Sequence, residues 1–224
     1  MKIQFNIGCV LICLFLSNAA YCQTYYADPE DVISKYQFSD SKEAFKLKTN
    51  IAFLAASVAN IGVEYLINDR LSVDFPVVFS PYNLKSGGEN SYAKKLRLFG
   101  FQPEIRYWLS SPMDGLFVGF HTHFLWYNVT NILDGNREIR YQDTDDKPLW
   151  GFGISYGYSM KMSQIIKGMS DNFGMEFSLG LGYAKMYYDR FYNIPNGRKY
   201  SSDTRSYWGV TRVGVNFTYR FDFK

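Results

Sequence analysis

The sequence has few of the residues on which catalytic and metal sites most often depend. Its 224 residues include three cysteines, Cys9, Cys13 and Cys22, and two histidines. Because all three cysteines precede Gln23, cleavage after Cys22 leaves a mature chain without a thiol, a disulfide or a cysteine metal site. The chain also lacks the Gly-x-Ser-x-Gly nucleophile motif and the glycine spacing of dinucleotide sites. We therefore expect a non-enzymatic protein with no cofactor.

Long apolar runs are missing beyond the N-terminal segment. No stretch of 18 apolar residues follows it, which excludes helical membrane spans. The formal net charge is only +3 and the basic residues are scattered, so we expect no nucleic-acid partner. Aromatic residues, in contrast, are abundant, with 19 Tyr and 19 Phe. High aromatic content without helical spans favours a β-barrel.

Residues 1–22 have the pattern of a secretory signal peptide. Lys2 gives a positive start, Ile7–Leu16 is the apolar core, and a small-x-small cleavage site ends at Cys22. The alternative is that Cys22 is a lipoprotein cysteine, although Tyr21 is bulky for the usual lipidation motif. We expect export by a cleaved signal peptide.

The remaining chain divides by pattern into two parts. Residues 23–45 are polar and show no sustained alternation, which predicts an N-terminal extension. Residues 46–224 alternate between large apolar and small or polar side chains, which predicts strands with two unlike faces.

The clearest alternation lies in Asn172–Tyr188. Six large residues fall on one face, and small or polar residues lie between them: Phe173, Met175, Phe177, Leu179, Leu181 and Tyr183. The pattern lasts for about the 9–11 residues that cross a bilayer as a tilted strand. We interpret the segment as a membrane-spanning strand with its apolar face toward lipid.

The same period predicts eight strands: Leu47–Ala55, Ile61–Ile67, Leu71–Phe79, Leu98–Leu109, Leu116–Asn128, Trp150–Met162, Asn172–Tyr188 and Tyr207–Phe223. Pro103 cannot donate to a ladder, so we expect a bulge or a strand end there. The predicted fold is all-β, an eight-stranded antiparallel up-and-down transmembrane β-barrel. A soluble lipocalin-like barrel is the main alternative.

Linker lengths are sorted as outer-membrane barrels require. Three links are short and are assigned to the periplasmic side: Asn68–Arg70, Ser110–Gly115 and Ser163–Asp171. Three long polar links are assigned to the outside: Ser80–Arg97, Val129–Leu149 and Asp189–Ser206. The first outer link, Ala56–Asn60, is shorter than expected. The predicted location is the cell outer membrane, with its lipid as a partner.

The inward-facing positions include acids and bases in equal number: Glu64, Asp74, Glu104, Arg106, Lys161, Glu176, Arg212 and Arg220. Eight strands enclose a lumen that side chains fill, and unpaired charges there would be costly. We expect a structural network of ion pairs that plugs the lumen. A proton or ion path through these residues is the alternative.

His121 and His123 are weaker candidates for a site. They flank Thr122, so both imidazoles face the lumen about one pleat apart, which is feasible for a two-nitrogen metal site. With no other histidine, carboxylates would have to complete it. Hydrogen-bonding histidines are the simpler interpretation, and we expect no metal. Aromatic residues near strand ends, Trp108 among them, are expected to form belts at the lipid interfaces, and a sugar-stacking surface is the alternative.

Four motifs resemble those of a known family: Leu47-Lys48-Thr49-Asn50, Gln102-Pro103-Glu104-x-Arg106-Tyr107-Trp108, Gly151-x-Gly153-x-Ser155-Tyr156-Gly157-Tyr158, and Gly180-x-Gly182-Tyr183-Ala184 with Tyr188-Asp189. The family is one of unknown function, of small exported outer-membrane barrels from Gram-negative gut anaerobes, often encoded beside fimbrillin-type pilus genes. The resemblance implies an outer-membrane barrel with a link to fimbriae, and it brings no catalytic residues.

These observations lead to three hypotheses of function. The first is a non-enzymatic barrel with a structural or surface-interaction role, whose long loops contact a pilus component or another surface protein. The second is a small-barrel lipid-modifying enzyme, which requires His121 or His123 at the lipid-facing rim. The third is a soluble periplasmic barrel that binds an apolar ligand. The sequence does not indicate an oligomeric state.

Overall fold

The computed structural model describes residues 44–84, 94–130, 139–194 and 196–222. The signal peptide predicted for residues 1–22, and all but the last two residues of the extension predicted for 23–45, lie outside these ranges. Within them the chain is all-β, and every pairing between strands is antiparallel.

The described chain forms ten strands and one short α-helix. In chain order they are β1 (Ala44–Asn50), α3 (Ile51–Ala55), β2 (Ala59–Leu66), β3 (Leu71–Leu84), β4 (Lys94–Phe101), β5 (Glu104–Trp108), β6 (Gly115–Thr130), β7 (Ile139–Asp143), β8 (Leu149–Lys161), β9 (Phe173–Tyr192) and β10 (Lys199–Asp222). Two 3-10 turns, Thr144–Asp146 and Met162–Gln164, follow β7 and β8.

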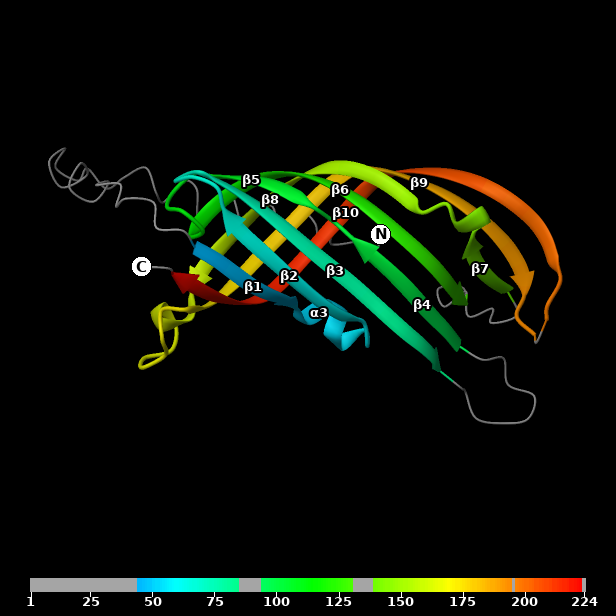
Figure 1. Cartoon of the computed structure of the whole chain (residues 1–224), viewed down its shortest axis with the longest axis horizontal. Helices are drawn as coiled ribbons and strands as arrows, with labels where there is room; N and C mark the ends of the chain where they lie inside the picture. The colour runs from blue at the N-terminus through cyan, green and yellow to red at the C-terminus, as the bar shows by residue number, and fades with distance from the viewer. Residues whose placement is uncertain (1–43, 85–93, 131–138, 195, 223–224) are drawn as a thin grey trace, which may run out of the picture. The chain divides into compact units, whose positions relative to one another are not determined.

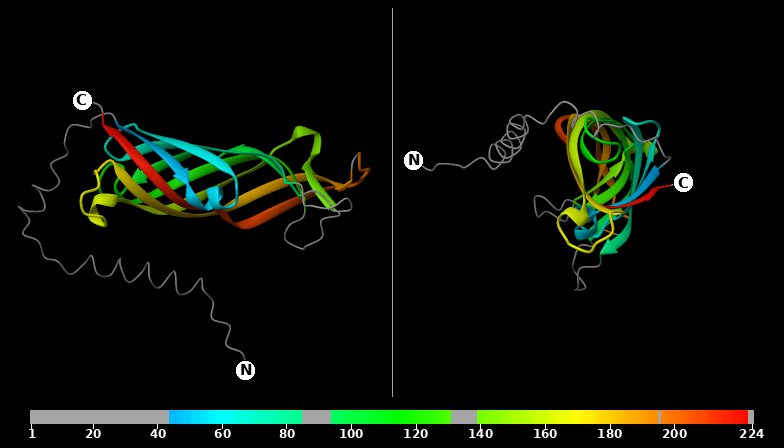
Figure 2. Two further views of the ribbon diagram at one scale, coloured as in Figure 1. Left: turned by 90° about the horizontal axis from the view of Figure 1, so that it is seen from below. Right: turned by 90° about the vertical axis from the view of Figure 1, so that its left-hand side faces the viewer.

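The strands form one sheet that returns to its start. Strands close in sequence pair with each other, and β10 pairs with β1 to complete a ring (Figures 1 and 2). The ten strands fill eight positions, because β4 and β5 lie end to end between β3 and β6, while β7 and β8 both lie between β6 and β9.

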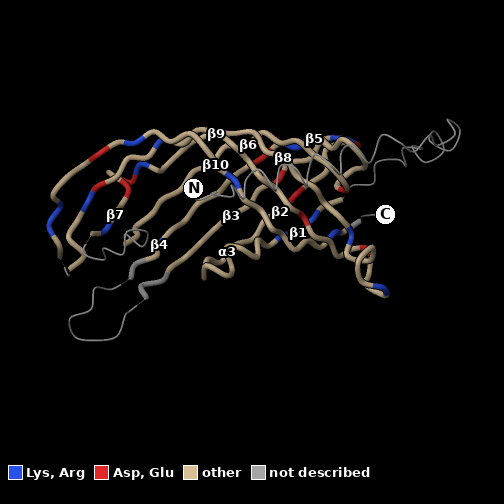
Figure 3. Tube along the Cα trace, turned by 180° about the vertical axis from the view of Figure 1, so that it is seen from behind, with Lys and Arg blue, Asp and Glu red and all other residues tan. Residues whose placement is uncertain are grey.

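The ring has two unlike ends. The near end holds Ala44, Asp222 and the turns at 67–70, 109–114 and 162–172. The far end holds the tip of the β9–β10 hairpin and β7, which begins beyond the far end of β8, whereas α3 follows β1 at the level of Asn216 on β10 and so lies short of the far end. Figure 3 shows charged positions gathered toward the near end and again around β7, with few between them.

The predicted alternation of the two faces is confirmed. On β9, Leu179 and Leu181 are exposed, the second to 60%, whereas Glu176 and Ser178 between the large residues are buried, the first completely. Apolar side chains therefore point away from the ring and polar ones point into it, as a strict period of two requires.

The prediction that Leu47–Ala55 is one strand is wrong for its second half. Ile51–Ala55 is a helix, and the strand begins earlier, at Ala44. The Asn50 side chain accepts a hydrogen bond of 3.0 Å from the Ala52 backbone N–H, which caps the helix and ends the strand. The apolar residues of this segment predict a strand only if the cap is overlooked.

The long outer links are also shorter than predicted. β7 lies inside the predicted link Val129–Leu149, and β9 and β10 continue through most of Asp189–Ser206. β3 and β4 likewise extend into Ser80–Arg97, of which 85–93 lie outside the described residues. Backbone pairing continues here without an apolar face, so alternation of hydrophobicity cannot reveal these strand ends.

The bulge or strand end predicted near Pro103 is confirmed as a strand end. β4 ends at Phe101 and β5 begins at Glu104, and between them the Gln102 N–H donates to the carbonyl of Pro76 at 3.0 Å. The interruption between β4 and β5 turns the Gln102 side chain into the ring.

Membrane-spanning helices are a separate question. None of the helices among the described residues has the length and apolar character to cross a bilayer.

Candidate functional site

Seven charged side chains meet inside the ring and form what we call the ionic plug. They come from six strands and are nearly inaccessible: Lys48 on β1, Glu64 on β2, Asp74 on β3, Glu104 and Arg106 on β5, Glu176 on β9 and Arg212 on β10. Each lies at an inward position of its strand, so the alternation that turns apolar residues outward brings these charges together.

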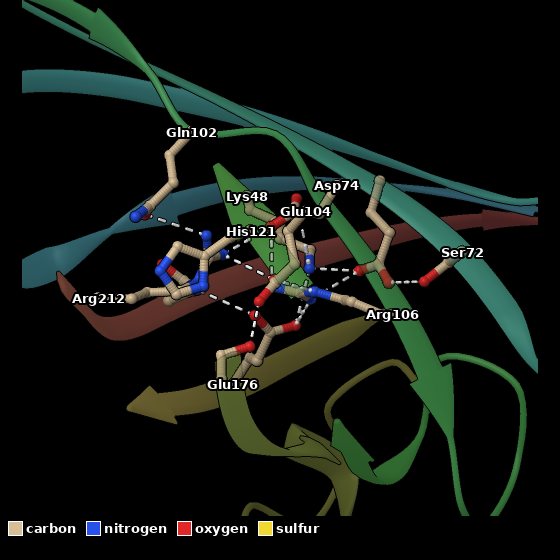
Figure 4. Close-up of polar contacts among 12 residues, drawn as sticks. Lys48, Ser72, Asp74, Gln102, Glu104, Arg106, His121, Glu176 and Arg212 are labelled. Atoms are coloured by element: carbon tan, nitrogen blue, oxygen red, sulfur yellow. Dashed lines mark hydrogen bonds and ion pairs between the residues drawn. The ribbon is translucent and has the colours of Figure 1, made fainter. Parts of the chain in front are cut away.

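Arg106 lies at the centre of the ionic plug and has an exposed fraction of 0% (Figure 4). Its guanidinium contacts all four carboxylates. The nitrogen-to-oxygen distances are 2.5 Å to Glu104, 2.8 Å to Asp74, 2.9 Å to Glu176 and 3.2 Å to Glu64. One guanidinium, with five N–H donors, thereby joins four strands across the lumen.

Lys48 and Arg212 supply the other two cations of the ionic plug. Lys48 Nζ pairs with Glu64 and lies 2.8 Å from Glu176. Arg212 lies 2.8 Å from Asp74 and 3.2 Å from Glu104. Every carboxylate therefore contacts Arg106 and at least one further cation, which offsets the cost of removing these charges from water.

Neutral donors bind three of the four acids. Ser72 donates to Glu64, and Ser155 on β8 donates to Glu104. The Asn216 amide donates to Glu176 at 3.0 Å. These bonds extend the network to a further strand, whereas the buried Oδ1 of Asp74 accepts no hydrogen bond among the described residues.

An apolar layer closes the near end of the lumen. Trp108 and Phe117 are fully buried, with ring centroids 4.9 Å apart, and Met113 packs in the same cluster. Trp108 Nε1 donates to Ser72 at 2.8 Å. The predicted place of Trp108 in a lipid-facing belt is therefore wrong, because its strand position points inward toward a hydrogen-bond acceptor.

Six of the eight charged residues predicted for the lumen lie in the ionic plug: Glu64, Asp74, Glu104, Arg106, Glu176 and Arg212. Arg220 lies nearer the end of β10 and donates to the Pro112 carbonyl at 3.2 Å. Among the described residues, no ion pair joins Lys161 to this network. Arg220 and Lys161 both lie closer to the near end of the ring than the ionic plug does.

Sequence reasoning missed two lysines. Lys46 and Lys48 are both buried, and Lys46 donates to the Met113 carbonyl and, at 3.0 Å, to Ser159. The signal for them is the alternation of Phe45 and Leu47 with these lysines, which becomes visible only if the first strand begins at Ala44.

His121 and His123 lie on the inner face of β6, on the far side of the ionic plug. His121 Nε2 is 2.9 Å from the Thr211 hydroxyl, and the two imidazole centroids are 6.0 Å apart. Within the described part of the chain, no cluster of three histidine, cysteine or acidic side chains has the geometry to hold a metal ion. The lipid-modifying hypothesis requires an imidazole at the outer rim, whereas both of these point inward.

Beyond the histidines lies a cavity of about 430 Å³, the apolar cavity. Its wall takes residues from α3 and from β3, β4, β6, β8, β9 and β10, among them Phe53, Val78, Leu125, Met186 and Val210. A smaller space of about 70 Å³ adjoins it and shares Gln102 and Thr211 with it. This smaller space is lined in part by Lys48, Asp74 and Arg212, so it connects the apolar cavity to the ionic plug.

The far end continues as a polar structure, the upper extension, which comprises β7 with its 3-10 turn and residues 187–206. Asp189 holds it together: it accepts hydrogen bonds of 2.9 Å from Thr144 and 2.8 Å from Ser202, and pairs with Lys199 at 2.8 Å. Burial alone would raise the pKa of Asp189, but these hydrogen bonds outweigh it and hold the pKa below its usual value.

Asp143 in the same extension behaves in the opposite way. Burial raises the pKa of this carboxyl above its usual value, although the Tyr127 backbone N–H donates to it at 3.2 Å. The nearby carboxylates of Asp146 and Asp189 raise the pKa further. The upper extension therefore contains one acid stabilised as the anion and one stabilised in the protonated form.

Comparison with known proteins gives one match. No curated protein and no solved structure matches the chain. The model of the family DUF3575, described as a protein of unknown function, matches residues 31–221 and so includes every residue of the ionic plug. The match confirms the part of the resemblance that indicates a family of unknown function. The chain belongs to the DUF3575 family of proteins of unknown function.

Proposed function

We propose that this chain is a transmembrane β-barrel of the outer membrane, with a sealed lumen and a non-enzymatic structural or surface-contact role. The observation that carries the proposal is the inverted polarity of the ring. Charged side chains are buried inside, while large apolar side chains are exposed outside. In water this arrangement would expose far more apolar surface than a soluble monomer tolerates.

The exposed apolar side chains belong to nearly every strand of the ring. They include Ile61 and Tyr65 on β2, Phe75 and Phe79 on β3, Ile105 and Tyr107 on β5, Phe120 on β6, Phe152 and Ile154 on β8, Leu179 and Leu181 on β9, and Val210 and Val213 on β10. Ile154 is 64% exposed, and β8 presents its alternate residues in the same way. A continuous belt of this kind fits a hydrocarbon layer.

The two ends of the ring fit the two sides of an outer membrane. The near end has the compact turns and both ends of the ring's chain, which is the periplasmic arrangement in barrels of this kind. The far end carries the polar upper extension, which would then project outside the cell. Export by the predicted signal peptide is consistent with this orientation.

The ionic plug and the apolar layer beneath it oppose conduction. Arg106 and Trp108 are both completely buried at this level of the lumen. An eight-position ring leaves an interior that side chains fill. We therefore expect planar bilayers containing the protein to show no channel currents.

The upper extension is the surface for a partner in this proposal. It exposes Arg190 and Asp203 to 34% and 44%, and these two form an ion pair of 3.2 Å across the hairpin. It also exposes the aromatic rings of Tyr192 and Tyr200. The resemblance to proteins encoded beside pilus genes supports a pilus component, or another surface protein, as that partner. Residues 131–138, which belong to the predicted outer link, lie outside the described residues.

Membrane fractionation tests the first part of the proposal. We expect the protein to stay in the outer-membrane fraction after carbonate washing. We also expect it to migrate differently in gels before and after boiling, because closed barrels resist detergent. Release by carbonate alone would overturn the membrane assignment and would favour the soluble periplasmic alternative.

A truncated hairpin tests the surface role. Replacement of residues 191–200 by a two-residue Asn-Gly turn shortens the upper extension and leaves the ring intact. We expect normal insertion but loss of binding to the fimbrial fraction sheared from the producing cells. A matched change in the near-end turn, at 164–170, should leave binding unchanged. Equal binding by all three proteins would overturn the surface role.

A further inference from the structure

The wall of the ring is incomplete beside the apolar cavity. β1 pairs with β10 only from Asn216 to Asp222, and β2 pairs with β3 only as far as Phe79. Among the described residues, no strand pairs with the edge of β10 between Lys199 and Val215 that faces away from β9. The β1–β2 hairpin is shorter than β3 and β10, so beyond α3 no described strand stands between those two strands, and we call this break in the wall the opening.

Side chains satisfy the backbone at the bottom of this opening. The Asn50 amide donates to the Val213 carbonyl at 2.9 Å, and the Gln102 amide donates to the Thr211 carbonyl at 3.0 Å. An unpaired strand edge in lipid would be costly without such partners. The two amides stabilise the part of this edge that lies nearest the ionic plug. They do not fill the space beyond it, toward the far end.

The opening leads into the apolar cavity, because the residues that border it also line the cavity. Phe53 on α3 and Tyr207 and Val210 on β10 do both, and all three are about 40–45% exposed. The volume of about 430 Å³ lies within the range of about 300–1,000 Å³ typical of ligand pockets.

One residue that lines this apolar space has a buried nitrogen without a hydrogen-bond partner. The buried Nδ1 of His123 has no hydrogen-bond partner among the described residues. His123 is a lining residue of the cavity, as are Gln102 and Thr211. An unsatisfied polar group of this kind costs about 1–3 kcal/mol, and a turn of the imidazole would bring this nitrogen to the cavity side of the ring.

We propose that the apolar cavity binds one long acyl chain, which enters sideways through the opening between β10 and β3. The polar end of the ligand, a carboxyl or an ester, lies against His123, Gln102 and Thr211. This inference rests on the proposed function, because a ring in the outer membrane presents this opening to lipid. A lipid acyl chain and a free fatty acid share the chemistry, and the experiment separates them.

The shapes of the two spaces agree with such a ligand. The wall of the apolar cavity accepts a chain with no polar groups, whereas the adjoining space of about 70 Å³ has room for a few water molecules or one small polar group. A sugar or a nucleotide would meet too few polar partners here. The ionic plug forms the floor, so the chain cannot pass through to the near end.

The test uses the full-length protein in lipid nanodiscs, with two photoactivatable probes in separate arms. One is a diazirine-labelled palmitic acid, and the other is a phosphatidylethanolamine with the diazirine in its acyl chain. Mass spectrometry then locates the labelled residues. We expect labelling concentrated on cavity residues such as Leu125 and Met186 with one probe or with both. Labelling by the palmitic acid indicates that the cavity accepts a free fatty acid, and labelling by the phosphatidylethanolamine indicates that it accepts the acyl chain of a membrane lipid.

A matched pair of variants controls for general contact with lipid. Ala184 lines the cavity and is 6% exposed, so Ala184→Phe fills the space and should lower cavity labelling about tenfold or more, the equivalent of about 1.4 kcal/mol. Leu179→Phe, on the outer face of the same strand, should change nothing. The heat-dependent gel mobility of each variant verifies that it has folded.

Two results would overturn the inference. One is labelling spread over the outer belt with no enrichment on cavity residues, and the other is equal cavity labelling in Ala184→Phe and the parent protein. If the protein inserts and either result is found, only the acyl-chain site fails. If it does not insert, the membrane proposal fails, and the palmitic acid arm repeated in buffer still decides whether the cavity binds an acyl chain.

Discussion

The two halves of the ring have opposite interiors although their strands are continuous. Toward the near end the lumen is filled by the ionic plug, in which each of the seven charged side chains forms at least one ion pair. Toward the far end it holds an apolar cavity with an unpartnered histidine nitrogen and an open wall. β6, β9 and β10 pass through both halves, so the difference comes from the side chains and from the short β1–β2 hairpin. One half suits rigidity, and the other suits a ligand.

The largest expected effect follows from removing the centre of the ionic plug. Arg106→Met leaves four buried carboxylates with two cations, and breaking a buried pair in this way typically costs about 3–5 kcal/mol. We expect loss of the heat-dependent gel mobility and of refolding into vesicles. Lys161→Met is the matched control and should refold normally. Similar losses in both variants would contradict the distinction between the ionic plug and its surroundings.

A charge on the outer face tests whether lipid surrounds both halves. Ile154→Arg places a cation in the exposed apolar belt, where the cost is about 2–4 kcal/mol at the bilayer midplane. Urea titration of folding into vesicles measures this change. Thr204→Arg, in the upper extension, should be close to neutral. If the two substitutions cost the same, water rather than lipid surrounds the belt.

A glycine substitution tests how tightly the histidines are packed in the cavity half. A Cβ at position 151 would lie 2.0 Å from the Tyr183 carbonyl and 2.5 Å from His123 Nε2, so Gly151→Ala must displace backbone. We expect a destabilisation of about 1–3 kcal/mol in the same urea titration. In Gly62→Ala the nearest atoms lie at 3.5 Å, and the protein should tolerate it. Equal tolerance would mean that the far half is loosely packed.

The smallest effect is a difference between two acids of the upper extension. The pKa of Asp143 is raised, so its contribution to stability is complete below the usual value of 3.8 and is lost as the pH rises through the folded value. The pKa of Asp189 is lowered, so its contribution is present above 3.8 and is lost as the pH falls through the folded value. On acidification Asp143 should therefore take up its proton first.

Carboxyl carbon shifts measured by NMR in nanodiscs report this order directly. Asp143→Asn and Asp189→Asn assign the two signals. At neutral pH, Asp189→Asn should also make the extension more sensitive to protease, because it loses the charge that holds Lys199 at 2.8 Å. If both acids titrate at one pH, the extension does not distinguish their environments.

The sequence predicts much of the fold, because a period of two determines which side chains share a face. Glu104 and Arg106 could be placed inside for that reason. The period does not show at which level of the ring a residue lies, so it could not separate Lys161 from the residues of the ionic plug. It also fails where both faces are polar, as in β7, and where a cap such as Asn50 ends a strand within an apolar run.

The apolar cavity could not be predicted from these patterns. It depends on how far β1 and β2 extend relative to β3 and β10, and strand length is set by pairing between residues distant in sequence. His123 was visible as an inward residue, but its missing partner is a property of the assembled wall. Topology, rather than composition, forms this site.

The position of the cations also bears on how the ring assembles. Lys48 and Arg212 belong to β1 and β10, the first and last strands, whose pairing joins the two ends of the sheet. Before that seam forms, Lys48 can already pair with Glu64 on the neighbouring strand β2. Its contact with Glu176 on β9, and the contacts of Arg212 with Asp74 and Glu104, need the two ends of the sheet to meet. Sealing the seam therefore completes the neutralisation of the four carboxylates, and the cations that complete it also fasten the two end strands to the rest of the ring.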